Sequence, residues 1–186
     1  MKSLYHRSDV ETAFSNTTAT EDSVKEIEIN QNDFESLFNA GVYFCELSEN
    51  KKAIACYDKA LEINPNNTSA IFNKGISLSR LGKQKDAITC YDKVLESDPN
   101  HMKSLCNKGV ALSRYGKQKD AIVCYDKVLE IDPNHMKSLS NKGVALSLLG
   151  NYEEASSFFD KALKIIPNDQ NIIDNIVSLK ISEGME

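Results

Sequence analysis

The residues best suited to chemistry are the five cysteines and three histidines of this 186-residue chain. Cys56, Cys90 and Cys124 form a series whose members are 34 residues apart, with no histidine close to them in the sequence. A constant spacing is typical of repeats, and equivalent residues on helices packed about 8 to 10 Å apart lie beyond the roughly 7 Å between Cα atoms that a disulfide allows. The chain also lacks a Cys-x-x-Cys pair. We therefore predict buried, reduced thiols, no metal site and no cofactor.

The remaining reactive side chains form no catalytic set. His101 and His135 are copies of one position in the turns after two prolines, and we predict that both face solvent. The sequence has no phosphate-binding glycine loop, no nucleophile elbow and no Cys/His nucleophile pair, and its carboxylates are scattered along polar helix faces. We predict that the protein is not an enzyme.

The elements that carry these residues are repeats. Residues 73–105 recur 34 positions later with five differences in 33 places. The prolines that mark the period are Pro65, Pro99, Pro133 and Pro167. The four units are residues 34–67, 68–101, 102–135 and 136–169.

Each unit has the pattern of two helices. In the third unit, Leu105 and Leu112 belong to one run of apolar residues at helical spacing, and Tyr125 and Val128 belong to a second. Between the halves stand Gly82, Gly116 and Gly150, which can end a helix in the left-handed conformation. The first unit has Ser48 there, and we expect a less ideal turn.

A second set of glycines lies inside the first helix of each unit, where glycine costs about 1 kcal/mol relative to alanine. These are Gly41, Gly75, Gly109 and Gly143. We predict that they allow close approach of the second helix through small residues there, for example between Gly109 and Ala121. Tyr57, Tyr91, Tyr125 and Phe159 should fill the adjoining core.

This arrangement resembles the tetratricopeptide repeat (TPR) family over residues 34–169. The family pattern of large residue, glycine, large residue, alanine, aromatic, small residue and proline is met in the third unit by Leu105, Gly109, Leu112, Ala121, Tyr125, Val128 and Pro133. The resemblance implies an all-α, right-handed TPR solenoid of four helix-turn-helix repeats. Two departures are leucine or isoleucine in place of the usual early tryptophan, and lysine before the glycine at Lys74, Lys108 and Lys142, whose stems can cover apolar surface.

The two ends of the repeat array need cover, because terminal caps keep solenoids soluble. Residues 170–186 should provide a capping helix over 170–182, with Ile173, Ile176, Val177 and Leu179 on its apolar side. Val177 stands where each full unit has glycine, so no second helix should pack on it. Residues 1–33 carry a net charge of -4 and should be a flexible or partly helical acidic segment.

In TPR proteins the first helices line a concave groove, and the resemblance implies a binding surface there. The basic residues that it assigns to this surface are Arg80, Arg114, Lys103 and Lys137, and the apolar ones are Phe38, Phe72, Val42, Ile76, Val110 and Val144. The alternative is a set of ordinary solvated charges and core side chains.

A further repeated position holds Asn39, Asn73, Asn107 and Asn141. An amide can donate and accept at once, which suits an extended peptide backbone. The series resembles the asparagine ladder in the repeats of O-linked N-acetylglucosamine transferases, although these 186 residues leave no room for their catalytic domain. The alternative is bonding to neighbouring helices. The carboxylate clamp of chaperone-binding TPR domains is not matched, since Phe38 and Val42 replace the required lysine and asparagine.

These features predict a protein-protein interaction module that binds an extended, acidic and partly apolar segment as an adaptor or scaffold. A self-associating structural module is the alternative. The net charge of -5 argues against nucleic acid as a partner. No run approaches the roughly 18 apolar residues of a membrane span, and the first residues lack a signal-peptide core, so a cytoplasmic location is expected.

Overall fold

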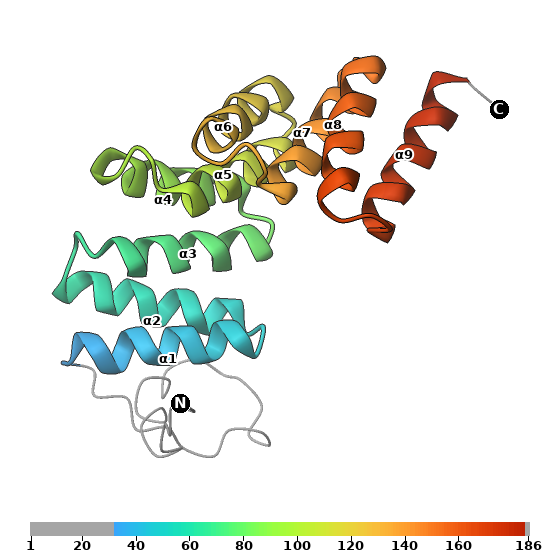
Figure 1. The fold of residues 1–186 in the computed structure, drawn as a ribbon. Coiled ribbons are helices and arrows are strands. Elements are labelled where there is room, and N and C mark those ends of the chain that lie inside the picture. The colour runs from blue at the N-terminus through green and yellow to red at the C-terminus, as the bar shows by residue number, and fades with distance from the viewer. Residues whose placement is uncertain (1–31, 185–186) are drawn as a thin grey trace. The chain divides into compact units, whose positions relative to one another are not determined.

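The computed structural model describes residues 32–184, and all regular structure in that range is α-helical (Figure 1). The nine helices of this range are α1 (Phe34–Glu46), α2 (Asn50–Ile63), α3 (Thr68–Arg80), α4 (Gln84–Ser97), α5 (Met102–Arg114), α6 (Gln118–Ile131), α7 (Met136–Leu148), α8 (Tyr152–Ile165) and α9 (Gln170–Glu183). The predicted all-α class, with four helix pairs and a final single helix, is confirmed. The predicted acidic segment lies almost wholly outside the described residues.

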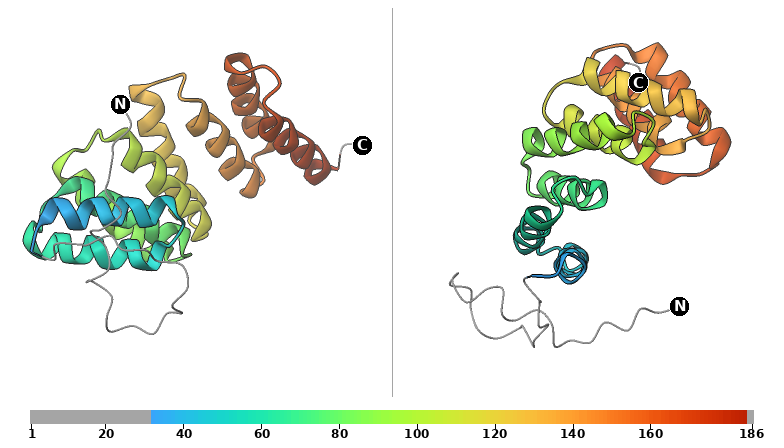
Figure 2. Two further views of the ribbon diagram at one scale, coloured as in Figure 1. Left: turned by 90° about the horizontal axis from the view of Figure 1, so that it is seen from below. Right: turned by 90° about the vertical axis from the view of Figure 1, so that its left-hand side faces the viewer.

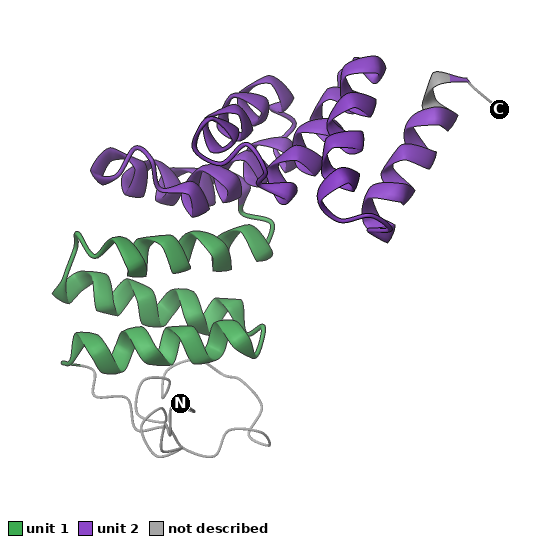
Figure 3. Cartoon of the chain, in the orientation of Figure 1, with its two compact units in different colours: residues 1–83 green, residues 84–186 purple. Residues whose placement is uncertain are grey.

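The chain forms two compact units, residues 1–83 and 84–186 (Figure 3). Unit 1 contains α1, α2 and α3, which lie side by side in the views of Figures 1 and 2. Unit 2 contains α4 to α9, in which each helix packs against the next. The boundary falls in the turn between α3 and α4.

The helices end close to the repeated prolines and glycines, as predicted. Each second helix of a repeat ends two residues before its proline, as α6 does before Pro133. Gly116, in the turn between α5 and α6, has a φ of 84°, in the left-handed region that glycine adopts without strain. Ser48 adopts the same region at 61°, where a side chain is disfavoured, so the less ideal first turn is confirmed.

The prediction that His101 and His135 are solvent residues is wrong, because both cap helices. Nδ1 of His101 accepts a hydrogen bond of 3.2 Å from the backbone N–H of Ser104 and lies 2.8 Å from its hydroxyl oxygen. His135 and Ser138 repeat this arrangement at the start of α7. Both serines are fully buried, so the imidazole supplies the acceptor that the first turn needs.

The interior glycines allow an aromatic ring to approach the first helix. A Cβ added at Gly109 would lie 2.5 Å from Cε1 of Tyr125, and one added at Gly143 would lie 2.6 Å from the same atom of Phe159. The predicted close packing is therefore confirmed with a different partner. The residue that excludes a larger side chain at Gly109 is Tyr125, and not Ala121, because the ring projects across the helix interface.

The lysines that depart from the family pattern link successive repeats. Lys74 pairs with Asp58, Lys108 with Asp92 and Lys142 with Asp126, each at 2.5 Å between ammonium and carboxylate. In each pair the lysine is on a first helix and the aspartate is on the second helix of the preceding repeat. The predicted exposure of the charged heads to water needs a correction, because each ammonium group is also held by a carboxylate.

Helix α9 covers the end of unit 2 and packs against α8 and α7. Ile172 and Leu179 of this helix are buried, and they join the core formed by Leu139, Leu146 and Phe159. The predicted apolar side needs one correction, because Val177 is 51% exposed and Ile172 takes its place. Ile172, Ile176 and Leu179 form one row at helical spacing, and Val177 lies off that row. No neighbouring helix buries Val177, as predicted.

Candidate functional site

The residues predicted to bind a partner lie on the first helices of the repeats: α1 and α3 in unit 1, and α5 and α7 in unit 2. Helix α1 contacts α3, and α5 contacts α7. Within each unit, equivalent positions one repeat apart are therefore on adjoining helices. Asn107 and Asn141 are one such pair, and Lys103 and Lys137 are another.

The four asparagines are half-buried at their common position. In Asn141 the side-chain nitrogen is shielded from water and has no hydrogen-bond partner within residues 32–184. A buried donor without a partner costs free energy, so this amide is the least satisfied member of the series.

The four basic residues are exposed, but one of them already has a role in the fold. The guanidinium of Arg80 donates to the carbonyl oxygen of Cys45 at 2.9 Å and approaches its sulfur at 3.1 Å. Arg80 therefore ties the end of α3 to the end of α1. Lys103, Lys137 and Arg114 extend from α5 and α7 into solvent.

The predicted apolar residues are half-buried, and some belong to the core margin. Phe38 stacks on Phe34 with 5.9 Å between ring centroids and lies 6.1 Å from the ring of Tyr57. Phe38 and Val42 pack against the core of unit 1, and Val144 packs against that of unit 2. These side chains are partly packed and partly exposed.

Three of the buried cysteines, Cys56, Cys106 and Cys124, are unsuited to nucleophilic chemistry. Four of the five cysteines are buried, Cys45 is partly exposed, and none of the five forms a disulfide. Burial raises the pKa of Cys56 to about 12 and also raises the pKa values of Cys106 and Cys124. The thiolate form, which is the nucleophile and metal ligand, is therefore suppressed at neutral pH. In the described part of the chain no three metal-binding side chains form a cluster.

One polar feature was missed by the sequence reasoning: the repeated lysine and aspartate form pairs. The signal was present, because lysines 74, 108 and 142 each follow an aspartate by 16 residues. Burial alone would lower the pKa of Lys108, but its hydrogen bond to Asp92 and the charge of that carboxylate outweigh burial and raise it. The lysine therefore stays protonated beside the hollow described below.

Models of one repeat family match most of the helical region. Models described as tetratricopeptide repeat match residues 68–101, 103–135 and 137–169, and one described as TPR repeat matches residues 41–82. No curated protein matches the chain. Among residues 32–184, no helix has the length and apolar character needed to cross a membrane.

Solved structures show the same fold. A MamA fragment from Desulfovibrio magneticus has a TM-score of 0.77 at 19% identity, over 84% of this chain and 87% of that one. YrrB, described as a TPR protein with an unusual peptide-binding site, has a TM-score of 0.69 at 22% identity, over 86% and 82%. A tetratricopeptide repeat protein from Parabacteroides merdae has a TM-score of 0.76 at 21% identity, over 84% of this chain and 61% of that one.

Proposed function

Since the chain belongs to the tetratricopeptide repeat family, we propose that it is a protein-interaction module that binds an extended segment of a partner protein on its first helices. In this role it acts as an adaptor or scaffold in the cytoplasm, without catalysis and without a cofactor. Stacked helix pairs create extended surfaces of this kind because each pair repeats the same side chains at a fixed rotation from the last. The ladder of asparagines, like that of the O-linked N-acetylglucosamine transferase repeats, is the recognition element in this proposal.

The observation that carries the proposal is the adjacency of α5 and α7. It makes neighbours of two repeat copies of the same polar positions, including Asn107 with Asn141. The carbonyl of an extended peptide would satisfy the unpaired side-chain nitrogen of Asn141 once that side chain turns toward solvent.

The chemistry of the partner follows from the surrounding side chains. Lys103 and Lys137 are exposed at matching positions, and Val110 and Val144 are half-buried on the same two helices. An acidic segment with some apolar side chains would complement both features. Each exposed charge contact contributes only about 0.2 to 1 kcal/mol and is screened by salt, so binding should weaken as ionic strength rises.

A labelled peptide with the sequence of residues 21–30 is a suitable probe, because it has four carboxylates and three β-branched apolar residues. We expect Lys103→Glu with Lys137→Glu, and separately Asn107→Ala with Asn141→Ala, to weaken its binding to the full chain in fluorescence anisotropy. The matched control is Lys93→Glu with Lys119→Glu, which makes the same charge change on exposed lysines of second helices. If this control weakened binding equally, net charge and not the first-helix surface would be responsible.

A self-associating structural module is the second candidate, and one observation favours it. Val177 and Ile181 on α9 are 51% and 73% exposed, so the covered end of unit 2 still presents apolar side chains. Light scattering over a range of concentrations tests this candidate. A constant monomeric mass would reject self-association. If the mass of the wild type rises with concentration, the double variant Val177→Ser with Ile181→Ser should remain a monomer.

A further inference from the structure

Unit 2 has a hollow of about 470 Å³ between α4 and α6, with α5 as its floor. Its apolar lining includes Ile88, Leu95, Leu105, Leu112, Val123 and Cys124. Hollows of this size accept small ligands or large side chains. The α5 residues in its floor occupy positions 105, 108 and 112, a different face of the helix from Lys103 and Asn107. The hollow is therefore separate from the first-helix surface proposed above.

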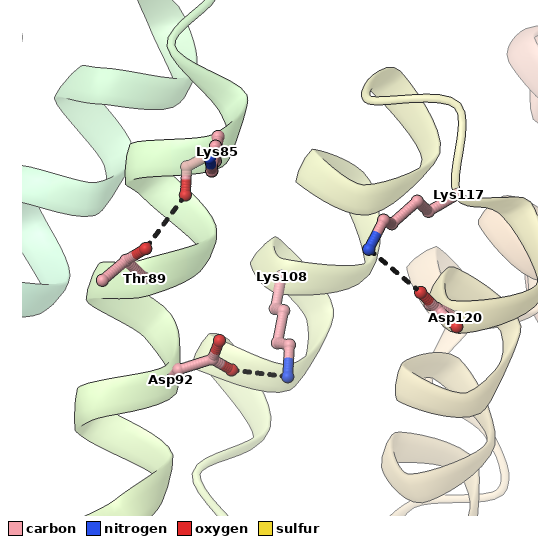
Figure 4. Close-up of polar contacts among 6 residues, drawn as sticks. All are labelled: Lys85, Thr89, Asp92, Lys108, Lys117 and Asp120. Atoms are coloured by element: carbon pink, nitrogen blue, oxygen red, sulfur yellow. Dashed lines mark hydrogen bonds and ion pairs between the residues drawn. The ribbon is translucent and has the colours of Figure 1, made fainter.

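Charged groups surround this apolar lining. Lys108 reaches from α5 to Asp92 of α4, and Lys117 lies 3.7 Å from Asp120 at the rim (Figure 4). Lys127 also lines the hollow, which brings the total to three lysines and two aspartates. One positive charge is in excess, so a carboxylate on an occupant would be favoured.

The next repeat supplies an internal comparison for the occupant. Helices α6, α7 and α8 repeat the arrangement of α4, α5 and α6, with Lys142 and Asp126 paired in the same way. Phe158 stands there in place of Cys124, and its ring centroid lies 4.1 Å from the ammonium nitrogen of Lys142. This distance is within the range of a cation–π interaction.

The two equivalent lysines also differ in exposure. The side chain of Lys142 is 11% exposed, whereas that of Lys108 is 25% exposed. In the later repeat the chain's own aromatic ring covers the lysine, and in the earlier repeat the smaller Cys124 leaves the equivalent lysine more open. The lysine keeps its aspartate partner when the ring is present, so both contacts are compatible.

We propose that the hollow between α4, α5 and α6 binds an aromatic side chain of a partner polypeptide, with a carboxylate nearby in the partner sequence. The ring lies over the ammonium group of Lys108 as Phe158 lies over that of Lys142. The carboxylate interacts with the excess positive charge at the rim. This contact adds a second recognition site to the module and does not depend on the first-helix surface.

The test uses the full chain and an acetylated, amidated pentapeptide, Glu-Gly-Phe-Gly-Glu, followed by changes in backbone amide NMR signals. We expect saturable shifts centred on α4, α5 and α6. The same peptide with alanine in place of phenylalanine should lose at least about tenfold in affinity, because the ring makes the buried contact. Absence of saturable binding, or shifts centred on Lys103 and Lys137, would overturn the proposal.

The decisive variant is Cys124→Phe, which supplies the ring that the next repeat already has. It should fold, since phenylalanine is accommodated at position 158, and it should lower peptide affinity at least about tenfold by occupying the hollow. The reciprocal Phe158→Cys should create a second hollow and raise the number of bound peptides from one to two. A folded Cys124→Phe chain that bound the peptide as tightly as the wild type would refute the proposal.

Two further measurements keep the test decisive. Should Cys124→Phe not fold, Lys108→Met with Asp92→Asn removes the ammonium without leaving an unpaired carboxylate, and unchanged affinity in that variant would count against the ring position. Light scattering identifies the source of the ring. A change in oligomeric state caused by Cys124→Phe would mean that another copy of this chain, and not a partner protein, supplies it.

Discussion

One repeat position decides how each first helix begins. Its occupants are Asp33, Asn67, His101, His135 and Asp169. In every case the side chain accepts a hydrogen bond from the backbone N–H three residues later. Carboxylate, amide and neutral imidazole all offer an acceptor at the required reach. Any side chain with such an acceptor can cap the helix. This explains why the position varies although most of the repeat is copied.

Replacing His101 should show how much this cap contributes to the stability of the protein. We expect His101→Ala to lower the free energy of unfolding by about 1 kcal/mol, within the range for lost N-caps, whereas His101→Asn should retain most of it. Urea unfolding of the two variants measures the difference. Equal stability of the alanine variant and the wild type would show that the imidazole contributes nothing to the helix start.

The ring of Tyr125 explains why position 109 of α5 is a glycine. Gly109→Leu should lower stability by about 1 to 3 kcal/mol, because Tyr125 is 1% exposed and has little space to move away. Thermal unfolding in two further backgrounds identifies the partner. Tyr125→Leu should reduce the cost of Gly109→Leu, and Ala121→Gly should not. Rescue by Ala121→Gly instead would restore the alanine contact predicted from sequence.

Helix α9 has one buried side and one exposed side. Ile172 is 1% exposed and Val177 is 51% exposed on the same helix. We expect Ile172→Ala to cost about 2 to 5 kcal/mol and Val177→Ala to cost little, because only the first removes a buried side chain. Hydrogen exchange of α7 and α8 should rise in the first variant alone. Equal protection in both variants would mean that α9 does not stabilise the helices it covers.

At the scale of the whole molecule, we expect the acidic N-terminal residues to compete for the proposed first-helix surface. Residues 21–29 combine acidic and apolar side chains, and covalent attachment raises their effective concentration toward the millimolar range, in order of magnitude. We expect deletion of residues 1–30 to strengthen binding of an acidic peptide at low salt and to have little effect at high salt. Anisotropy titrations at two ionic strengths measure this. Equal affinities of the full and truncated chains at low salt would exclude competition by the tail and leave the surface itself untested by that result.

The sequence by itself determined the repeat register, the two helices of each unit and their ends. These are local properties: prolines spaced by 34 residues stop helices, Gly116 adopts a backbone conformation that few other residues tolerate, and apolar periodicity marks helices wherever they pack. The burial of Cys56, Cys90 and Cys124 followed as well, because equivalent positions in a repeat share one environment. The family pattern also placed the exposed basic residues Arg80, Arg114, Lys103 and Lys137 on the first helices.

Only the tertiary structure decided which side chains meet. The contact of Gly109 with Tyr125, the link from Arg80 to Cys45 and the lysine–aspartate pairs each join residues 16 to 35 positions apart. Such partners depend on the angle and offset of two packed helices, which composition and periodicity leave open. The sequence shows that Cys124 and Phe158 occupy equivalent positions in successive repeats. The consequence of this difference, an open hollow in one repeat and a covered lysine in the next, required the positions of three helices at once.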